Sequence, residues 1–184
     1  MGLAEMIDIV NRDDEVIGVK PRDEVWEDEI TRSSACFVID KEGNILIAQR
    51  DVSKKYNPGI WSIAVAETVQ AWEDYLTAII RGAYEEIQLS AISDDFVARE
   101  KIFYPRNNIF RQTYFMICTE EQKKQLVPKE GEVQAIQWVP VLDLKKMIEE
   151  MPALFSRSLP EILPYREKYK QAIITALEER KAPQ

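Results

Sequence analysis

Residues 67–89, ETVQAWEDYLTAIIRGAYEEIQL, form the stretch that decides the fold. From residue 74 onward the apolar side chains recur with the period of an α-helix. We therefore predict one helix over residues 74–87, with its apolar stripe packed against a mixed β-sheet. The stripe consists of Leu76, Ile79, Ile80, Ala83 and Ile87.

The other side of this predicted helix carries an unusual group of charges. Clustered carboxylates repel one another, so stability does not explain them well. A divalent cation would turn that repulsion into ligation, because hard ions such as Mg²⁺ bind carboxylate oxygens. The alternative is a solvated acidic helix face, which is the usual place for charged side chains. The group consists of Glu73, Arg81, Glu85, Glu86 and Gln88.

The spacing of these residues resembles the signature box of the Nudix hydrolase superfamily. That box reads Gly, five residues, Glu, seven residues, Arg-Glu, an apolar residue, any residue, Glu-Glu, any residue, Gly and an apolar residue. Three positions depart from it: Glu67 and Gln88 stand where the two glycines belong, and Gly82 replaces the Glu after the Arg. The positions that match in register are Glu73, Arg81, Ala83, Glu85, Glu86 and Leu89.

Two flanking runs resemble the branch of this family that is related to isopentenyl diphosphate isomerase. They are PGIWSIAVAETVQAWED at residues 58–74 and IDIVNRDDEVIGVKPRDEV at residues 7–25. The resemblance covers roughly residues 5–141. It implies an α+β fold, an α/β/α sandwich on a mixed sheet, in a single domain over residues 1–184. Residues 142–184 are expected to form a helical C-terminal extension.

The resemblance also implies a metal-dependent hydrolase that acts on a nucleoside diphosphate derivative or another small-molecule diphosphate. Mg²⁺ or Mn²⁺ would be held by Glu85 and Glu86. Arg81 would keep these carboxylates in register by ion pairing, and Glu73 would brace the junction between loop and helix. A further acidic residue, Glu130 or Glu132, would assist the metal, and we favour Glu132.

Basic residues outside the box are candidates for binding the substrate phosphates. In the family, a basic loop such as residues 51–59 lies near the substrate. The plain alternative for each of these residues is a solvated surface cation. The candidates are Arg50, Lys54, Lys55, Arg106 and Arg111.

The three departures break local structural rules within the presumed active site. Gly82 in mid-helix costs about 1 kcal/mol relative to alanine. Gln88 lies near the helix end, where glycine readily adopts the left-handed conformation that closes a helix. Glu67 is expected in a tight loop where the family uses a residue without a side chain. Such clustering is typical of functional or altered sites, and it indicates either natural decay of the ancestral activity or deliberate re-engineering.

Two functions from different classes therefore remain open. One is a Nudix-type hydrolase impaired by the degenerate box. The other is a catalytically inactive or engineered Nudix-fold scaffold or binding protein. Isomerase activity is the least favoured, because that enzyme uses an active-site cysteine before its box and residues 62–66 contain none.

Composition excludes several other classes. The 184 residues carry 32 acidic and 24 basic side chains, a net charge of −8, so binding to duplex nucleic acid is not expected. No apolar run approaches the ~20 residues of a membrane span, and the N-terminus lacks the layout of a signal peptide, which predicts a cytoplasmic protein. Histidine is absent, which excludes Ser-His and Cys-His nucleophiles and His-ligated zinc. The oligomeric state is left open.

Periodicity and turn residues predict the remaining elements. Cys36 and Cys118 lie in apolar strand-like runs and are expected to be small buried hydrophobes. Helices are expected at residues 120–125, 143–151 and 165–180, with a helical turn at 23–26. Strands are expected at residues 6–10, 16–20, 34–40, 45–50, 61–65, 96–104, 109–118 and 133–141.

Overall fold

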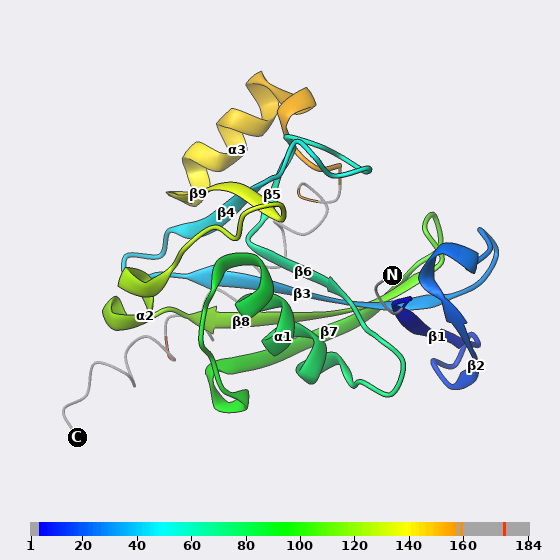
Figure 1. The fold of residues 1–184 in the computed structure, drawn as a ribbon. Coiled ribbons are helices and arrows are strands. Elements are labelled where there is room, and N and C mark those ends of the chain that lie inside the picture. Colours follow the sequence, from blue (N-terminus) through cyan, green and yellow to red (C-terminus); the bar gives the residue numbers. More distant parts are fainter. Residues whose placement is uncertain (1–3, 158, 160–174, 176–184) are drawn as a thin grey trace.

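A mixed seven-stranded sheet forms the centre of the computed structural model, which describes residues 4–157, 159 and 175 (Figure 1). The strand order is β5-β4-β3-β8-β7, with β6 paired to β3 and β9 paired to β4. β3 and β8 are parallel and the other pairs are antiparallel. The strands are β3 (Thr31–Ile39), β4 (Ile45–Arg50), β5 (Trp61–Ile63), β6 (Val65–Thr68), β7 (Phe96–Tyr104), β8 (Ile109–Ile117) and β9 (Val133–Val139).

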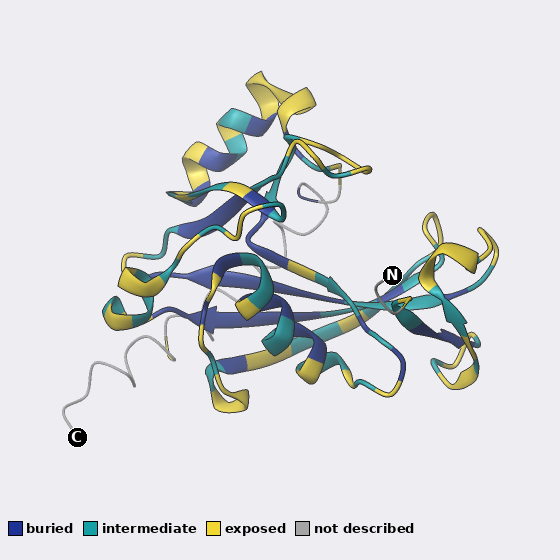
Figure 2. Cartoon of the chain, in the orientation of Figure 1, coloured by how far each residue is buried: buried dark blue, intermediate teal, exposed yellow. Residues whose placement is uncertain are grey.

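Helices cover both faces of this sheet. α1 (Tyr75–Ile87) lies on one face and α3 (Val141–Glu150) on the other, while the short α2 (Glu120–Gln125) follows β8. Successive residues of β3 alternate between two cores. Phe37 and Ile39 pack on the α3 side, and Cys36 and Val38 pack on the α1 side. Figure 2 shows the buried central strands and the exposed outer faces of the helices, and the predicted α/β/α sandwich is confirmed.

The helix predicted at residues 74–87 is also confirmed, with both of its ends defined. Asp74 caps the start of α1 by accepting a hydrogen bond from the backbone N–H of Thr77 at 2.7 Å. Gln88 ends the helix in the left-handed conformation, with φ 53° and ψ 28°. The predicted stripe packs toward the sheet: Ile79, Ala83 and Ile87 are buried, and Leu76 and Ile80 are partly buried against the same core.

A separate N-terminal hairpin, β1 (Met6–Val10) and β2 (Val16–Pro21), docks beside the central sheet. A buried ionic contact fixes its turn. Asp14 accepts hydrogen bonds from Nε of Arg32 at 2.7 Å and from the hydroxyl of Tyr75 at 3.0 Å, and it also pairs with Lys101. These partners belong to three elements of the main domain.

One sequence prediction near the box is wrong. The strand expected at residues 61–65 is divided at Ala64, because β5 pairs with β4 whereas β6 pairs with β3. The strand β6 then continues to Thr68. Glu67 therefore lies in a strand, paired with Ser34, and not in a tight loop.

Other differences are shifts of element ends. β3 begins at Thr31, three residues before the prediction, and α3 covers 141–150 where 143–151 was expected. The helical turn expected at 23–26 is a 3₁₀ turn at 22–24, and two further 3₁₀ turns cover 93–95 and 152–154. Of the helix expected at 165–180, only residue 175 is among the described residues. Cys36 and Cys118 are buried free thiols as predicted, and no helix in the described part of the chain is long and apolar enough to cross a membrane.

Candidate active site

Arg81 joins three carboxylates on the outer side of α1. Its Nε and Nη2 donate to the two oxygens of Glu73 at 2.8 and 3.0 Å. Its Nη1 donates to Glu67 and to Glu85, each at 3.0 Å, and Nη2 also reaches the carbonyl oxygen of Thr68 at 3.0 Å. The rigid fork of the guanidinium thus fixes these acidic side chains relative to α1 and β6.

The side chain of Glu67 extends from β6 over Gly82 to reach this cluster. Glu67 pairs in register with Ser34, whose hydroxyl donates to the backbone carbonyl of Tyr75 in α1 at 2.6 Å. Both side chains therefore point toward α1. A Cβ atom on Gly82 would stand 2.0 Å from Cγ of Glu67 and 3.1 Å from its Cδ. The side chain of Glu67 fills the space that the glycine leaves free.

Two of the carboxylates have a raised proton affinity. Burial raises the pKa of Glu67, although the Arg81 guanidinium acts in the opposite direction. Burial also holds the pKa of Glu86 well above its usual range, and the charge on Glu67 adds to that effect. A positive charge placed near these groups would favour their ionised forms.

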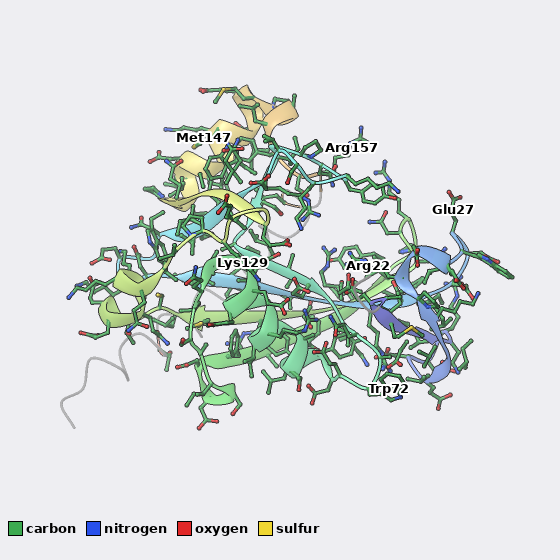
Figure 3. All side chains as sticks on the ribbon, viewed as in Figure 1. Arg22, Glu27, Trp72, Lys129, Met147 and Arg157 are labelled. Atoms are coloured by element: carbon green, nitrogen blue, oxygen red, sulfur yellow. The ribbon has the colours of Figure 1, made fainter. Side chains whose placement is uncertain are left out.

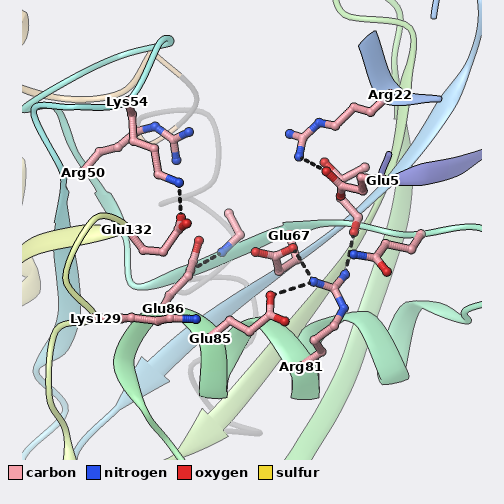
Figure 4. Close-up of a pocket in the computed structure, with 13 residues that line it drawn as sticks. Glu5, Arg22, Arg50, Lys54, Glu67, Arg81, Glu85, Glu86, Lys129 and Glu132 are labelled. Carbon is pink, nitrogen blue, oxygen red and sulfur yellow. Dashed lines mark hydrogen bonds and ion pairs between the residues drawn. The ribbon is translucent and has the colours of Figure 1, made fainter. Parts of the chain in front are cut away.

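The carboxylates of Glu67, Glu85 and Glu86 face a polar pocket of about 270 Å³, here termed the acidic pocket (Figure 4). Basic side chains surround them. Lys54, from the loop after β4, forms an ion pair with Glu132. From the opposite side, Arg22 pairs with Glu5 at 2.8 Å. The other basic residues that line the pocket are Arg50, Arg81 and Lys129.

A family model described as the NUDIX domain matches residues 29–159. The chain belongs to the Nudix family. It is 30% identical to a prenyl-diphosphate phosphatase of Methanosarcina mazei, over 85% of this chain and 91% of that protein. It is 28% identical to an isopentenyl-diphosphate Delta-isomerase of Brevibacterium linens, over 85% of this chain and 88% of that protein. These relatives confirm the predicted branch of the Nudix family.

A solved structure shares the Nudix fold over most of the chain. The crystal structure of DR0079 from Deinococcus radiodurans has a TM-score of 0.70 and 23% sequence identity. The comparison covers 88% of this chain and 98% of that one. At this level of identity the likeness concerns the fold alone.

The structure gathers most of the predicted Nudix site residues at one place. Glu85, Glu86, Arg81 and Glu132 line the acidic pocket, while Glu73 holds the guanidinium of Arg81. Of the predicted phosphate-binding residues, Arg50 and Lys54 line the pocket as well. The carboxylates that line the pocket, and so are available to a cation, are Glu5, Glu67, Glu85, Glu86 and Glu132.

Three of the predicted basic residues lie elsewhere. Lys55 places its Nζ 5.1 Å from the ring centre of Tyr56 and is not among the residues that line the acidic pocket. Arg106 and Arg111 line a second pocket. Arg106 lies in the β7–β8 turn, beyond the residues of β8 that pair with β3, and Arg111 pairs with Ser33, so its side chain lies on the face of the sheet away from α1.

Sequence reasoning did not find three of the charged residues that line the acidic pocket. Glu5 and Arg22 come from the N-terminal hairpin region and Lys129 from the loop before β9. None stands at a fixed spacing from the Nudix box. No signal of a strand was available for Glu67 either, because the run Val65-Ala66-Glu67-Thr68 does not alternate apolar and polar residues.

Proposed function

We propose that this Nudix protein hydrolyses a small-molecule diphosphate in the acidic pocket, with Mg²⁺ or Mn²⁺ as cofactor. The observation that carries the proposal is the exchange between Glu67 and Gly82. The Nudix box has a glutamate after its arginine, where this chain has Gly82. Glu67 brings a carboxylate into the same space from β6. Relative to the Nudix box, the acidic group is on the strand β6 and not on the helix α1, and the site has the same number of carboxylates.

The donor set suits a hard divalent cation. Burial raises the pKa of both Glu67 and Glu86, and a cation would relieve this by favouring their charged forms. Among the described residues, no three acidic side chains already converge into a closed metal site. An open set of donors suits Mg²⁺, which keeps several of its own waters and takes few carboxylates.

Each part of the pocket has a role in this chemistry. A bound cation supplies charge neutralisation at the phosphate and lowers the pKa of a water. Arg81 acts as a positioning residue, because it holds Glu67 and Glu85 at 3.0 Å. Arg50 and Lys129 line the same pocket and would donate to phosphate oxygens of the substrate.

The names of the relatives favour a diphosphate as the group on which the enzyme acts. Those reported above are described as a prenyl-diphosphate phosphatase and an isopentenyl-diphosphate Delta-isomerase. Isomerase chemistry is less favoured for this chain, because the described residues that line the acidic pocket include no cysteine. Cys36 is buried in the α1 core, and Ala66 lies at the pocket edge of β6.

The test is Mg²⁺-dependent release of phosphate or diphosphate from a panel of prenyl and nucleoside diphosphates. Wild-type protein should turn over at least one of them. Glu67→Gln preserves side-chain volume and removes the charge, and it should lower kcat by about 100-fold or more. Glu67→Gly combined with Gly82→Glu returns the carboxylate to the helix and should restore activity relative to Glu67→Gly alone.

Two outcomes would contradict the proposal. Full activity in Glu67→Gln would show that the displaced carboxylate has no role in the reaction. Wild-type protein that stays inactive across the panel, with no gain in the exchanged double variant, would favour a Nudix-fold binding protein instead.

A further inference from the structure

A second, larger pocket lies on the side of the sheet away from α1. Its volume is about 730 Å³, within the range of small-molecule sites. The β7–β8 turn, the loop 51–60 and the segment after α3 form its walls, and Figure 3 shows Arg157 near the tip of that loop. Its main lining side chains are Asn57, Tyr104, Arg106, Arg111, Phe155 and Arg157; we term it the arginine pocket.

The described side chains that line this pocket carry the opposite charge to the whole chain. Three guanidinium groups line it, and the described lining residues include no Asp or Glu. The whole chain has a net charge of −8, so three arginines among the described residues that line one pocket differ from its average surface. Arginine is also the side chain best suited to bind phosphate or carboxylate through two parallel hydrogen bonds.

The protein holds one of these arginines in place. Nε of Arg111 donates to the hydroxyl of Ser33 at 3.2 Å, and its guanidinium carbon lies 5.2 Å from the ring centre of Tyr104. Such contacts limit the conformations of the side chain, so less entropy is lost when it binds an anion.

The acidic pocket and the arginine pocket border strands that pair with the same strand, β3. Ser33 pairs in register with Thr68 on one side and with Arg111 on the other. Thr68 lines the acidic pocket and Arg111 lines the arginine pocket. Adjacent strands are about 4.8 Å apart, so the backbones of these two residues are separated by roughly 10 Å. Ser33 and its two partners alternate with Ser34 and Glu67, so their side chains point away from α1.

We propose that the substrate carries a second anionic group, of the phosphate class, which the arginine pocket binds while the diphosphate lies in the acidic pocket. This inference rests on the proposed function and specifies its substrate. A prenyl chain would place only hydrocarbon against three guanidinium groups. The expected substrate therefore differs in its distal half from the prenyl diphosphates in the names of the relatives.

Binding without metal tests the arginine pocket independently of hydrolysis. In EDTA, the carboxylates of the acidic pocket repel anions, so inorganic phosphate should bind at the arginine pocket. Its binding, followed by ³¹P NMR titration, should weaken about tenfold or more in the double variant Arg106→Gln, Arg157→Gln. It should persist in Glu85→Gln, Glu86→Gln and in the control Arg12→Gln, an exposed arginine outside both pockets. Undetectable phosphate binding, or binding that the arginine variant retains, would overturn the inference.

Hydrolysis of two matched probes then tests the substrate class. Dimethylallyl diphosphate and 5-phosphoribosyl 1-diphosphate both place a diphosphate on a five-carbon skeleton, and only the second ends in a phosphate. Wild-type kcat/KM should favour 5-phosphoribosyl 1-diphosphate by about tenfold or more. The arginine double variant should lose most of that preference, whereas Arg12→Gln should keep it.

The two proposals fail in different ways. A wild-type preference for dimethylallyl diphosphate would overturn the second anion site and leave the hydrolase intact. If neither probe nor any other diphosphate is hydrolysed, the proposed function fails, and the metal-free phosphate titration alone decides whether the arginine pocket binds anions.

Discussion

The side chain of Glu67 in β6 fills the space that a side chain at Gly82 of α1 would occupy. A Cβ built on Gly82 of α1 would stand 2.0 Å from Cγ of Glu67 in β6, a distance that two nonbonded carbons cannot keep. Two of the three departures from the Nudix box are therefore coupled through this contact. The glycine is required where it stands, although it weakens the helix by about 1 kcal/mol relative to alanine.

Because of this contact, the effect of one substitution on the free energy of unfolding should change sign between two backgrounds. Gly82→Ala improves helix propensity by about 1 kcal/mol, yet in the wild-type protein it should destabilise by about 1–3 kcal/mol, because the new methyl group meets Glu67. In a Glu67→Gly background the same substitution should stabilise. Urea unfolding of the four proteins measures the coupling energy directly. If Gly82→Ala stabilises both backgrounds equally, the side chain of Glu67 does not lie over residue 82.

Cation binding should depend on the paired glutamates of α1. Glu85→Gln with Glu86→Gln removes two negative oxygen donors, so Mn²⁺ affinity measured by isothermal titration should fall by at least about 100-fold. The control is Glu149→Gln with Glu150→Gln, an exposed Glu-Glu pair on α3. Unchanged Mn²⁺ affinity in the α1 variant would place the ion elsewhere.

Gln88→Gly should stabilise the protein by about 0.5 kcal/mol. Gln88 has φ 53°, a conformation that costs a side chain about 1 kcal/mol, and the greater freedom of glycine in the unfolded chain offsets part of the gain. Tyr84→Gly, at an exposed position within the same helix, should instead destabilise by roughly 0.5 kcal/mol. The free energy of unfolding in urea distinguishes the two, and equal losses in both would contradict the strained C-terminus of α1.

Asp40 should contribute stability that disappears in acid. Its carboxylate is buried. Burial alone would raise its pKa, but hydrogen bonds from Lys123 at 2.9 Å and from Asn44 outweigh burial and hold the pKa below its ordinary value of 3.8. A lowered carboxyl pKa stabilises the fold above the unfolded pKa, and the contribution is lost as the pH falls through the folded value.

Asp40→Asn should therefore cost about 2 kcal/mol at pH 7, and the difference from wild type should shrink as the pH falls below about 4. Asp94→Asn, at an exposed carboxyl, serves as the control. Urea denaturation at several pH values measures both. A difference that stays constant down to pH 3 would show that the charge on Asp40 does not stabilise the fold.

The fold and part of the site could be predicted from the sequence because their signals are local. The apolar stripe of α1 is readable within one helix, and so is the placement of Glu85 and Arg81. The position of Glu67 could not be predicted, because it depends on the chain leaving β4 after β5 and pairing with β3 through β6. The place of Arg111 in the arginine pocket could not be predicted for a similar reason: the parallel pairing of β8 with β3 joins residues far apart in the chain.

The exchange also constrains the order in which such a sequence can arise. From the Nudix pattern, with glycine at position 67 and glutamate at position 82, single substitutions lead through one of two intermediates. Glutamate at both positions would force two side chains into one volume. Glycine at both positions leaves a small gap and keeps the fold, at the cost of one acidic group. A chain that departs from the Nudix pattern by single substitutions is therefore expected to pass through the pair of glycines, with one acidic group fewer in the pocket, before a glutamate at position 67 replaces that group from the opposite wall.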